Sequence, residues 1–272
     1  MRRRNFLAAT GLAGAAALGG TATAASALAP EAKGSTRELI ELRVYRCEKP
    51  EMAASLDKFF AEAAVPAWNR LGSKPVGIFA LADGQTLPAG TSACDRYVVL
   101  GHKSAESFLC GQGRLWADAA YQKAGAACLD TPKDAPPFTR IETSLLVAFE
   151  KAPTLLTPGG MKPERVFQLR IYESACEERA RLKIDMFNGG GELDLFRDAG
   201  LTWVFFGQSV AGPKMPNLTY MVGFESPDAQ KAAWDKFKGS EGWKKLSADP
   251  KYKDTVSAIT NLILKPTAAS QI

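Results

Sequence analysis

The side chains with the most chemical potential in this sequence are aromatic, amide and carboxylate groups of its C-terminal half. Small-molecule sites combine an apolar or aromatic wall with a few polar groups that converge on the ligand, and these residue types suit such a site. Glu192 could serve there as a carboxylate base. A packed core with loop-capping amides uses the same residue types, and a carboxylate is ordinary in the first turn of a helix. The candidate ligand-binding residues are Tyr172, Asn188, Glu192, Asn217, Tyr220, Trp234 and Asn261.

The single histidine, His102, lies at the end of a predicted strand. A histidine there could hold a haem iron or act as a general base. Phe224 occupies the matching position in the second copy of a repeat described below, which favours an ordinary strand-end position. A zinc site would need cysteines as well, and the sequence has no C-x-x-C pair. Cys94, Cys110 and Cys128 would have to converge on His102, so we expect neither a metal nor a cofactor.

Two glycine-rich segments could be mistaken for catalytic motifs. The segment from Gly207 to Gly212 has one residue too many for a G-x-S-x-G nucleophile elbow, and it falls in a predicted hairpin. Gly189 to Gly191 follows a helical segment and lacks the Lys-Ser/Thr pair of a phosphate-binding loop, so it predicts a hinge or a helix break. The sequence therefore assigns no catalytic residue.

The first 27 residues have the pattern of an export signal. Arg3, Arg4, Phe6 and Leu7 resemble a twin-arginine motif, and an Ala/Gly/Leu run with A-x-A cleavage candidates follows them. This run is too rich in Gly and Ala for a strong membrane span. The sequence predicts a cleaved signal at residues 1–27, a periplasmic protein, and no stable membrane anchor after cleavage.

Charge and cysteine content narrow the functional classes further. The formal net charge of +5 falls to +2 once Arg2, Arg3 and Arg4 are removed with the signal, which gives little attraction for nucleic acid. The 5 cysteines are an odd number. Because twin-arginine substrates fold before export, in a reducing cytoplasm, we expect a fold that does not depend on disulfides.

A repeat sets the organisation of the chain. Leu42-Arg43-Val44-Tyr45 recurs as Leu169-Arg170-Ile171-Tyr172, and similar elements follow each copy. A repeat of this length indicates two copies of one α+β unit. We expect a first unit at residues 38–150, a linker at 151–163 that is rich in Pro and Gly, and a second unit at 164–272.

Hydrophobic periodicity gives each unit the order βαββαβ of a ferredoxin-like fold. The segment Trp203–Phe206 is apolar on both faces of its strand, as in a sheet covered by helices on one side and by another sheet on the other. The fold class is therefore α+β, with the two units forming a pseudo-dimeric α+β barrel. Predicted strands are 38–46, 76–81, 96–102, 143–149, 166–173, 203–207, 218–225 and 258–264. The long predicted helices are 50–63, followed by a second turn or kink from Pro66 to Gly72, and 104–127, 177–199 and 227–237.

The second unit resembles the NIPSNAP family. The resemblance is carried by Met186-Phe187-Asn188, by the run from Val204 to Gly207, by Pro216-Asn217-Leu218-Thr219-Tyr220-Met221, and by Trp234, Trp243 and the terminal Ser270-Gln271-Ile272. The first unit is a weaker match without the Pro-Asn-Leu-Thr segment, so we expect any family function to lie in the second. The resemblance implies tandem NIPSNAP domains in a dimeric α+β barrel, for which no defined biochemical activity follows.

Three functional hypotheses remain open. The first is binding of a small apolar or aromatic ligand in the second unit. The second is an enzyme of the cofactor-free monooxygenase or isomerase kind, in which Tyr220 or Glu192 moves protons. The third is a non-catalytic module that binds a protein partner, and association into a homo-oligomer is compatible with each of the three.

Overall fold

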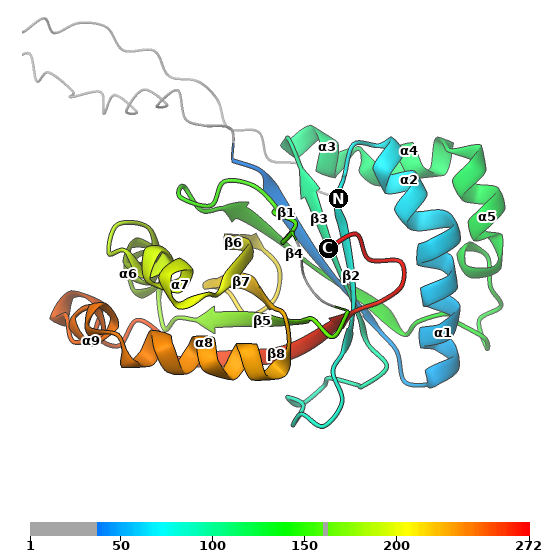
Figure 1. Ribbon diagram of the computed structural model, residues 1–272. Helices are drawn as coiled ribbons and strands as arrows, with labels where there is room; N and C mark the ends of the chain where they lie inside the picture. The colour runs from blue at the N-terminus through cyan, green and yellow to red at the C-terminus, as the bar shows by residue number, and fades with distance from the viewer. Residues whose placement is uncertain (1–36, 160–162) are drawn as a thin grey trace, which may run out of the picture. The chain divides into compact units, whose positions relative to one another are not determined.

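The computed structural model describes residues 37–159 and 163–272 (Figure 1). The predicted signal at residues 1–27, with Arg3, Arg4, Phe6 and Leu7, lies outside the described residues. No helix in the described ranges is both long and apolar enough to cross a membrane.

The described strands close into one antiparallel barrel in the order β1-β3-β2-β8-β5-β7-β6-β4. Each half of the chain contributes four consecutive neighbours, and the halves join where β2 pairs with β8 and β4 pairs with β6. This arrangement confirms the predicted pseudo-dimeric α+β barrel. The strands are β1 Leu39–Arg46, β2 Val76–Leu81, β3 Arg96–His102, β4 Arg140–Ala148, β5 Val166–Glu173, β6 Thr202–Ala211, β7 Asn217–Phe224 and β8 Ala258–Pro266.

The barrel interior is an apolar core that both halves share. Strand alternation turns every second side chain inward, and Leu42 of β1 and Leu169 of β5 belong to this core. Phe79 of β2 and Phe167 of β5 meet there with ring centroids 5.0 Å apart. The intervening side chains point outward to helices, so each half also has an apolar layer between sheet and helices.

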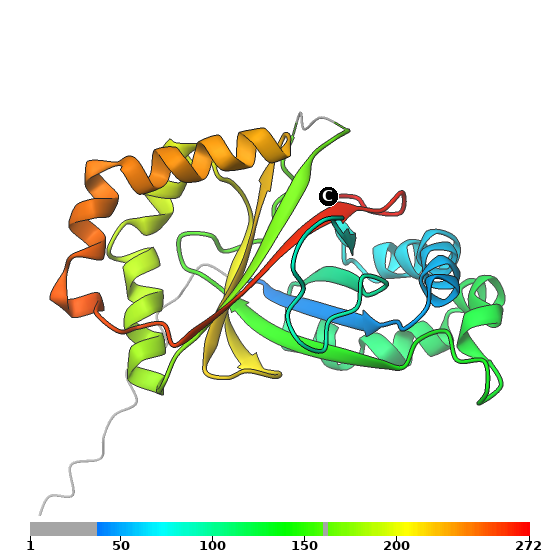
Figure 2. The ribbon, with the colours of Figure 1, turned by 90° about the horizontal axis from the view of Figure 1, so that it is seen from below.

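Helices of the two halves cover opposite sides of the barrel, in both cases on its outer face (Figures 1 and 2). In the first half, α1 (Pro50–Phe59) runs through a π-helical turn, Phe60–Ala64, into α2 (Val65–Arg70). Pro66 is the second residue of α2, where its missing N–H is tolerated, and α2 is the second turn that was expected from Pro66 onward.

The predicted helix at 104–127 is three helices: α3 (Ala105–Leu109), α4 (Gly111–Ala117) and α5 (Ala119–Leu129). Asp118 interrupts the pattern because its carboxylate accepts hydrogen bonds from the N–H groups of Ala120 and Tyr121, both at 3.0 Å. A side chain that caps a new helix competes with continuation of the previous one.

The predicted helix at 177–199 divides into α6 (Glu177–Asn188) and α7 (Glu192–Ala199) at the three glycines. Gly191 has φ +89°, a left-handed conformation that favours glycine, and a Cβ on Gly190 would lie 2.7 Å from the carbonyl oxygen of Met186. The expected helix break is therefore confirmed. Further on are α8 (Pro227–Gly239), α9 (Glu241–Ser247) and the 3₁₀ turn Pro250–Tyr252.

Candidate functional site

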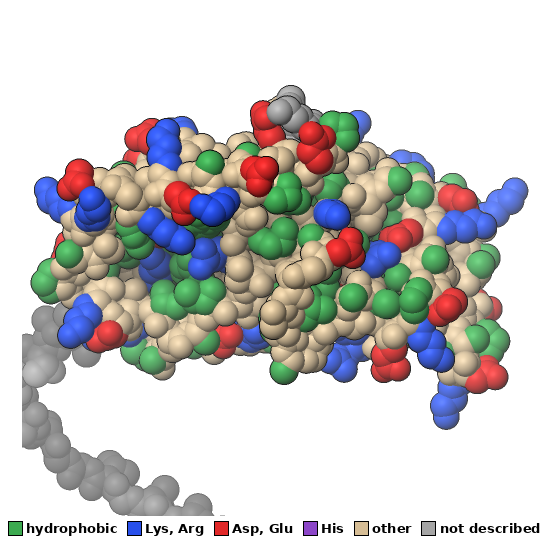
Figure 3. Space-filling model, turned by 60° about the horizontal axis from the view of Figure 1, so that its bottom comes forward, with side chains coloured by type: hydrophobic (Ala, Val, Ile, Leu, Met, Phe, Trp, Pro, Cys, Tyr) green, Lys and Arg blue, Asp and Glu red, His purple; other side chains and the backbone are tan. Residues whose placement is uncertain are grey.

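A cavity of about 420 Å³ lies in the second half, between the outer face of the sheet and its helices. Side chains of β5, α6, α7, α8, α9 and β8 converge on it. On the face drawn in Figure 3, Lys and Arg side chains gather around hydrophobic ones in this region. We call it the helix-side cavity, and it is lined by Arg170, Tyr172, Lys183, Glu192, Trp234, Phe237, Lys238, Trp243, Val256 and Ile259.

Arg170 of β5 enters the cavity between two aromatic rings. Its guanidinium carbon lies 5.1 Å from the ring centroid of Tyr172 and 5.0 Å from that of Trp234. These are distances at which a cation is attracted by an aromatic face. Gln168 fixes one of these walls, because its side-chain oxygen accepts hydrogen bonds from Nε1 of Trp234 at 2.6 Å and from Nε2 of Gln230 at 3.0 Å.

A buried ion pair forms the polar floor of the cavity. Nζ of Lys183 on α6 lies 2.7 Å from Oε2 of Glu192, the first residue of α7, and the two side chains are 5% and 2% exposed. The glycine break lets α7 turn back so that these residues meet. Burial raises the pKa of Glu192, although the charge and hydrogen bond of Lys183 oppose this.

Two tyrosines lie one behind the other beside this pair. The hydroxyl oxygens of Tyr172 and Tyr220 are 3.1 Å apart. Burial raises the pKa of Tyr172, and it raises that of Tyr220 well above the ordinary value of 10.0. Tyr220 is fully buried and stacks on Phe206, with ring centroids 5.2 Å apart. Both phenols are therefore neutral at physiological pH, and only Tyr172 reaches the cavity.

The structure brings some of the predicted site residues together and separates others. Tyr172, Glu192 and Trp234 line the helix-side cavity, and Tyr220 supports Tyr172 from behind. Asn261 accepts a hydrogen bond from Nε2 of Gln168 at 2.5 Å, one residue removed from the cavity wall.

The other two candidate amides lie elsewhere. Asn188 accepts a hydrogen bond from the N–H of Lys151 at the end of α6. Asn217 donates to the carbonyl oxygens of Pro213 and Lys214 and accepts from the hydroxyl of Thr219. These contacts match the loop-capping alternative left open by the sequence.

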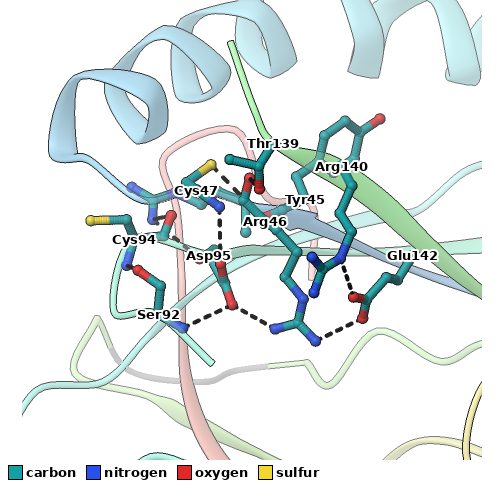
Figure 4. A network of polar contacts seen from close by, with 10 residues as sticks. Tyr45, Arg46, Cys47, Ser92, Cys94, Asp95, Thr139, Arg140 and Glu142 are labelled. Atoms are coloured by element: carbon teal, nitrogen blue, oxygen red, sulfur yellow. Dashed lines mark hydrogen bonds and ion pairs between the residues drawn. The ribbon is translucent and has the colours of Figure 1, made fainter. Parts of the chain in front are cut away.

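Asn217 borders a second, smaller cavity of about 120 Å³ at one end of the barrel interior. A network of charged groups closes this end (Figure 4). Arg46 of β1 lies between two carboxylates, with Nη1 2.6 Å from Oδ2 of Asp95 and Nη2 2.7 Å from Oε2 of Glu142. Asp95 also accepts the backbone N–H groups of Cys47 and Ser92. The network ties β1, β4 and the loop before β3 together.

His102 is part of a buried network in the first half. Its Nε2 lies 2.8 Å from Oε2 of Glu41, which also forms an ion pair with Arg43. Burial tends to raise the pKa of Glu41, but hydrogen bonds and charge from His102 and Arg43 outweigh it and lower the pKa. The side chain of His102 therefore has a structural partner.

Cysteines and acidic groups form no metal cluster within the described ranges. All five cysteines fall in the described part of the chain, and each is a free thiol there. Cys110 and Cys176 are exposed, whereas Cys47 and Cys128 are buried.

Seven of the ten lining residues were absent from the sequence-based set, among them Arg170, Lys183 and Trp243. Arg170 could have been identified from the sequence, because it belongs to the repeated Leu-Arg-Ile-Tyr segment. It alternates there with Leu169 and Ile171 on a strand whose two faces are covered. A cation at such a position lies under the helices that cover the sheet, where it can form part of a site. Lys183 had no comparable signal within a charged helix.

Comparisons with solved structures place the fold among the dimeric α+β barrels. A protein of Fusobacterium nucleatum whose proposed activity is that of a monooxygenase has a TM-score of 0.52 and 8% identity, over 85% of this chain and 93% of its own. A protein of Lactobacillus acidophilus with the same proposed activity has a TM-score of 0.51 and 8% identity, over 86% and 97%. At this identity the likeness concerns the fold alone.

The second half is also matched by sequence. The NIPSNAP family model matches residues 167–271. The matched range contains β6 to β8, all of β5 except Val166, and all lining residues of the helix-side cavity. A comparison with curated proteins finds no match.

Proposed function

We propose that the second half of the barrel binds a small molecule with a flat aromatic or apolar body in the helix-side cavity. The observation that carries this proposal is a cavity of about 420 Å³ with four aromatic walls, Tyr172, Trp234, Phe237 and Trp243, and polar groups on one side. Ligand pockets have volumes of about 300–1,000 Å³ and are lined in this way.

The aromatic walls suit a flat ligand. Trp234 and Phe237 lie edge to face, with centroids 5.7 Å apart, and Phe237 lies 4.6 Å from Trp243. Each aromatic pair contributes about 0.5–1.5 kcal/mol beyond the area it buries, so a ring inserted among these walls gains several such contacts. The neutral hydroxyl of Tyr172 can donate or accept one hydrogen bond.

Intrinsic fluorescence tests the proposal, because Trp234 and Trp243 line the cavity. Titration with naphthalene-2-carboxamide, a neutral two-ring compound, should shift or quench the emission with saturation. Val256→Trp should block binding by filling the cavity. Val210→Trp is the matched control, since Val210 is 46% exposed and does not line the cavity. Equal saturable binding by both variants, or no saturable binding of this compound or its carboxylate analogue by the wild type, would overturn the proposal.

A second candidate function is proton transfer on the bound molecule, as in a cofactor-free monooxygenase or isomerase. Glu192 favours it, since this carboxyl group lines the cavity and burial raises its pKa. Tyr220 has no contact with the cavity and stays protonated, so Glu192 is the base to test. Glu192→Gln should abolish turnover of a bound ligand while binding persists; unchanged turnover would exclude the role.

We further propose that the chain is exported through the twin-arginine pathway. Arg3, Arg4, Phe6 and Leu7 support this, together with the Ala/Gly-rich run after them. Fractionation of cells that express the full chain should find a shortened protein in the periplasm. Replacement of Arg3 and Arg4 by Lys should retain the full-length protein in the cytoplasm, and an unchanged distribution would contradict the proposal.

A further inference from the structure

The strand β1 of the first half can be compared with β5 of the second half, which lines the helix-side cavity. On the outer face of β1, Glu41, Arg43 and Tyr45 alternate with inward-facing residues. The matching positions of β5 are Gln168, Arg170 and Tyr172, so the two copies differ at one position by a carboxylate against an amide.

The replacement of the carboxylate by an amide changes whether the neighbouring arginine has a counter-ion. In the first half, Arg43 forms an ion pair with Glu41, and its guanidinium also lies 5.7 Å from the ring centroid of Trp68. In the second half, Gln168 is neutral, and its side chain forms hydrogen bonds with Trp234, Gln230 and Asn261.

Arg170 therefore keeps its stacking contacts but lacks a counter-ion. Among residues 37–159 and 163–272 it forms no ion pair, and its Nε is buried with no hydrogen-bond partner. Of the other two cations in the cavity lining, Lys183 is paired with Glu192 and Lys238 is exposed. The cavity lining thus has three cations, Arg170, Lys183 and Lys238, and one carboxylate, Glu192. This excess of positive charge beside the aromatic walls favours an anion.

We propose that the ligand of the helix-side cavity is an aromatic carboxylate whose carboxyl group binds Arg170 and serves as its counter-ion, as Glu41 does for Arg43. This inference rests on the proposed function. A planar guanidinium matches a planar carboxylate with two parallel N–H···O bonds. The rings of Tyr172 and Trp234 restrict the approach to a flat group, which favours a carboxylate over a tetrahedral phosphate.

A matched pair of compounds tests the charge separately from the ring. Naphthalene-2-carboxylate and naphthalene-2-carboxamide have nearly the same shape, and only the first is an anion. The wild type should bind the carboxylate about tenfold to one hundredfold more tightly, as expected for hydrogen bonds to a charged group. Arg170→Met should remove this preference and leave amide binding measurable.

Gln168→Glu is the sharper variant because it reproduces the first copy. Its carboxylate can still accept the Trp234 N–H, and it should neutralise Arg170 from within the protein and remove the preference for the anionic compound. Lys244→Met is the control, since it removes an exposed cation from α9 that does not line the cavity. It should keep the preference.

The outcomes are distinct. Equal binding of both compounds by the wild type would overturn the carboxylate inference and leave the cavity as a neutral aromatic site. A preference that survives both Arg170→Met and Gln168→Glu, or that Lys244→Met removes as fully, would also overturn it. Binding of neither compound would overturn the proposed function, and this inference with it.

Discussion

Single residues decide how buried charge is balanced in this protein. Glu41 and Arg43 neutralise each other under the first-half helices, and Lys183 and Glu192 do so under those of the second. A buried pair of this kind is sensitive to the loss of one partner, because the other charge is left without compensation in a poorly hydrated place.

Lys183→Met should therefore lower the free energy of unfolding by about 3–5 kcal/mol. Chemical denaturation at neutral pH measures the change. Replacing both partners, as Lys183→Met with Glu192→Leu, should restore much of the loss. Lys231→Met, which breaks an exposed pair with Asp235, is the control and should have little effect. A loss from Lys183→Met no larger than that of the control would show that the buried pair does not stabilise the fold.

The pKa of Glu41 predicts a dependence of stability on pH. Its folded-state pKa lies below the ordinary value of 4.5, so the group stabilises the fold at pH values above that value. This contribution is lost as the pH falls through the folded-state pKa. Between pH 6 and pH 3, Glu41→Gln should lose less stability than the wild type in urea denaturation. Parallel losses in the two proteins would contradict the lowered pKa.

At the scale of elements, the break between α6 and α7 gives the cavity its floor. Only the turn at Gly189–Gly191 allows Glu192 to reach Lys183 across the two helices. The conformation of Gly191, with φ +89°, is one that a side chain disfavours. A change in this turn should thus affect both stability and the cavity.

Gly191→Ala should lower the free energy of unfolding by about 1–2 kcal/mol, the cost of a left-handed conformation for a residue with a Cβ. It should also weaken binding of naphthalene-2-carboxamide, because α7 must shift. Gly239→Ala at the end of α8 is the matched control: a Cβ there meets open space and its φ is not positive. The two variants should differ clearly in thermal denaturation, and equal melting temperatures would refute the role of the turn.

The sequence predicted most of the helices and strands. It predicted only in part which side of the sheet each residue faces. The repeat and the two-residue alternation of apolar residues predicted the barrel and its strands. The division of the predicted helix at 104–127 was missed, because the helical pattern of the sequence continues through Asp118, whose carboxylate caps a new helix. Asn217 and Tyr220 are three residues apart on β7 and hence face opposite sides of the sheet. Treating them as one site overlooked this alternation.

At the scale of the whole molecule, the barrel makes the two halves one structural unit. They share the interior core, two strand pairings and a C-terminal segment whose Ser270 and Gln271 side chains accept backbone N–H groups of β2. The first half therefore supports the strands on which the candidate site of the second half is built. The two halves therefore differ in role: both build the barrel, and the second half contains the candidate site.

Shared packing predicts that the halves unfold together. Phe167→Ala removes a fully buried ring that meets Phe79 across the interior, and it should cost about 3–5 kcal/mol. Hydrogen exchange should show equal loss of protection for the slowest amides of β1 and β3 and for those of β5 and β7. Ile259→Ala, at a side chain that is 52% exposed, is the control and should change neither set. Loss confined to β5 and β7 would show that the two halves open independently, because cooperative unfolding requires the first half to sense a cavity made in the second.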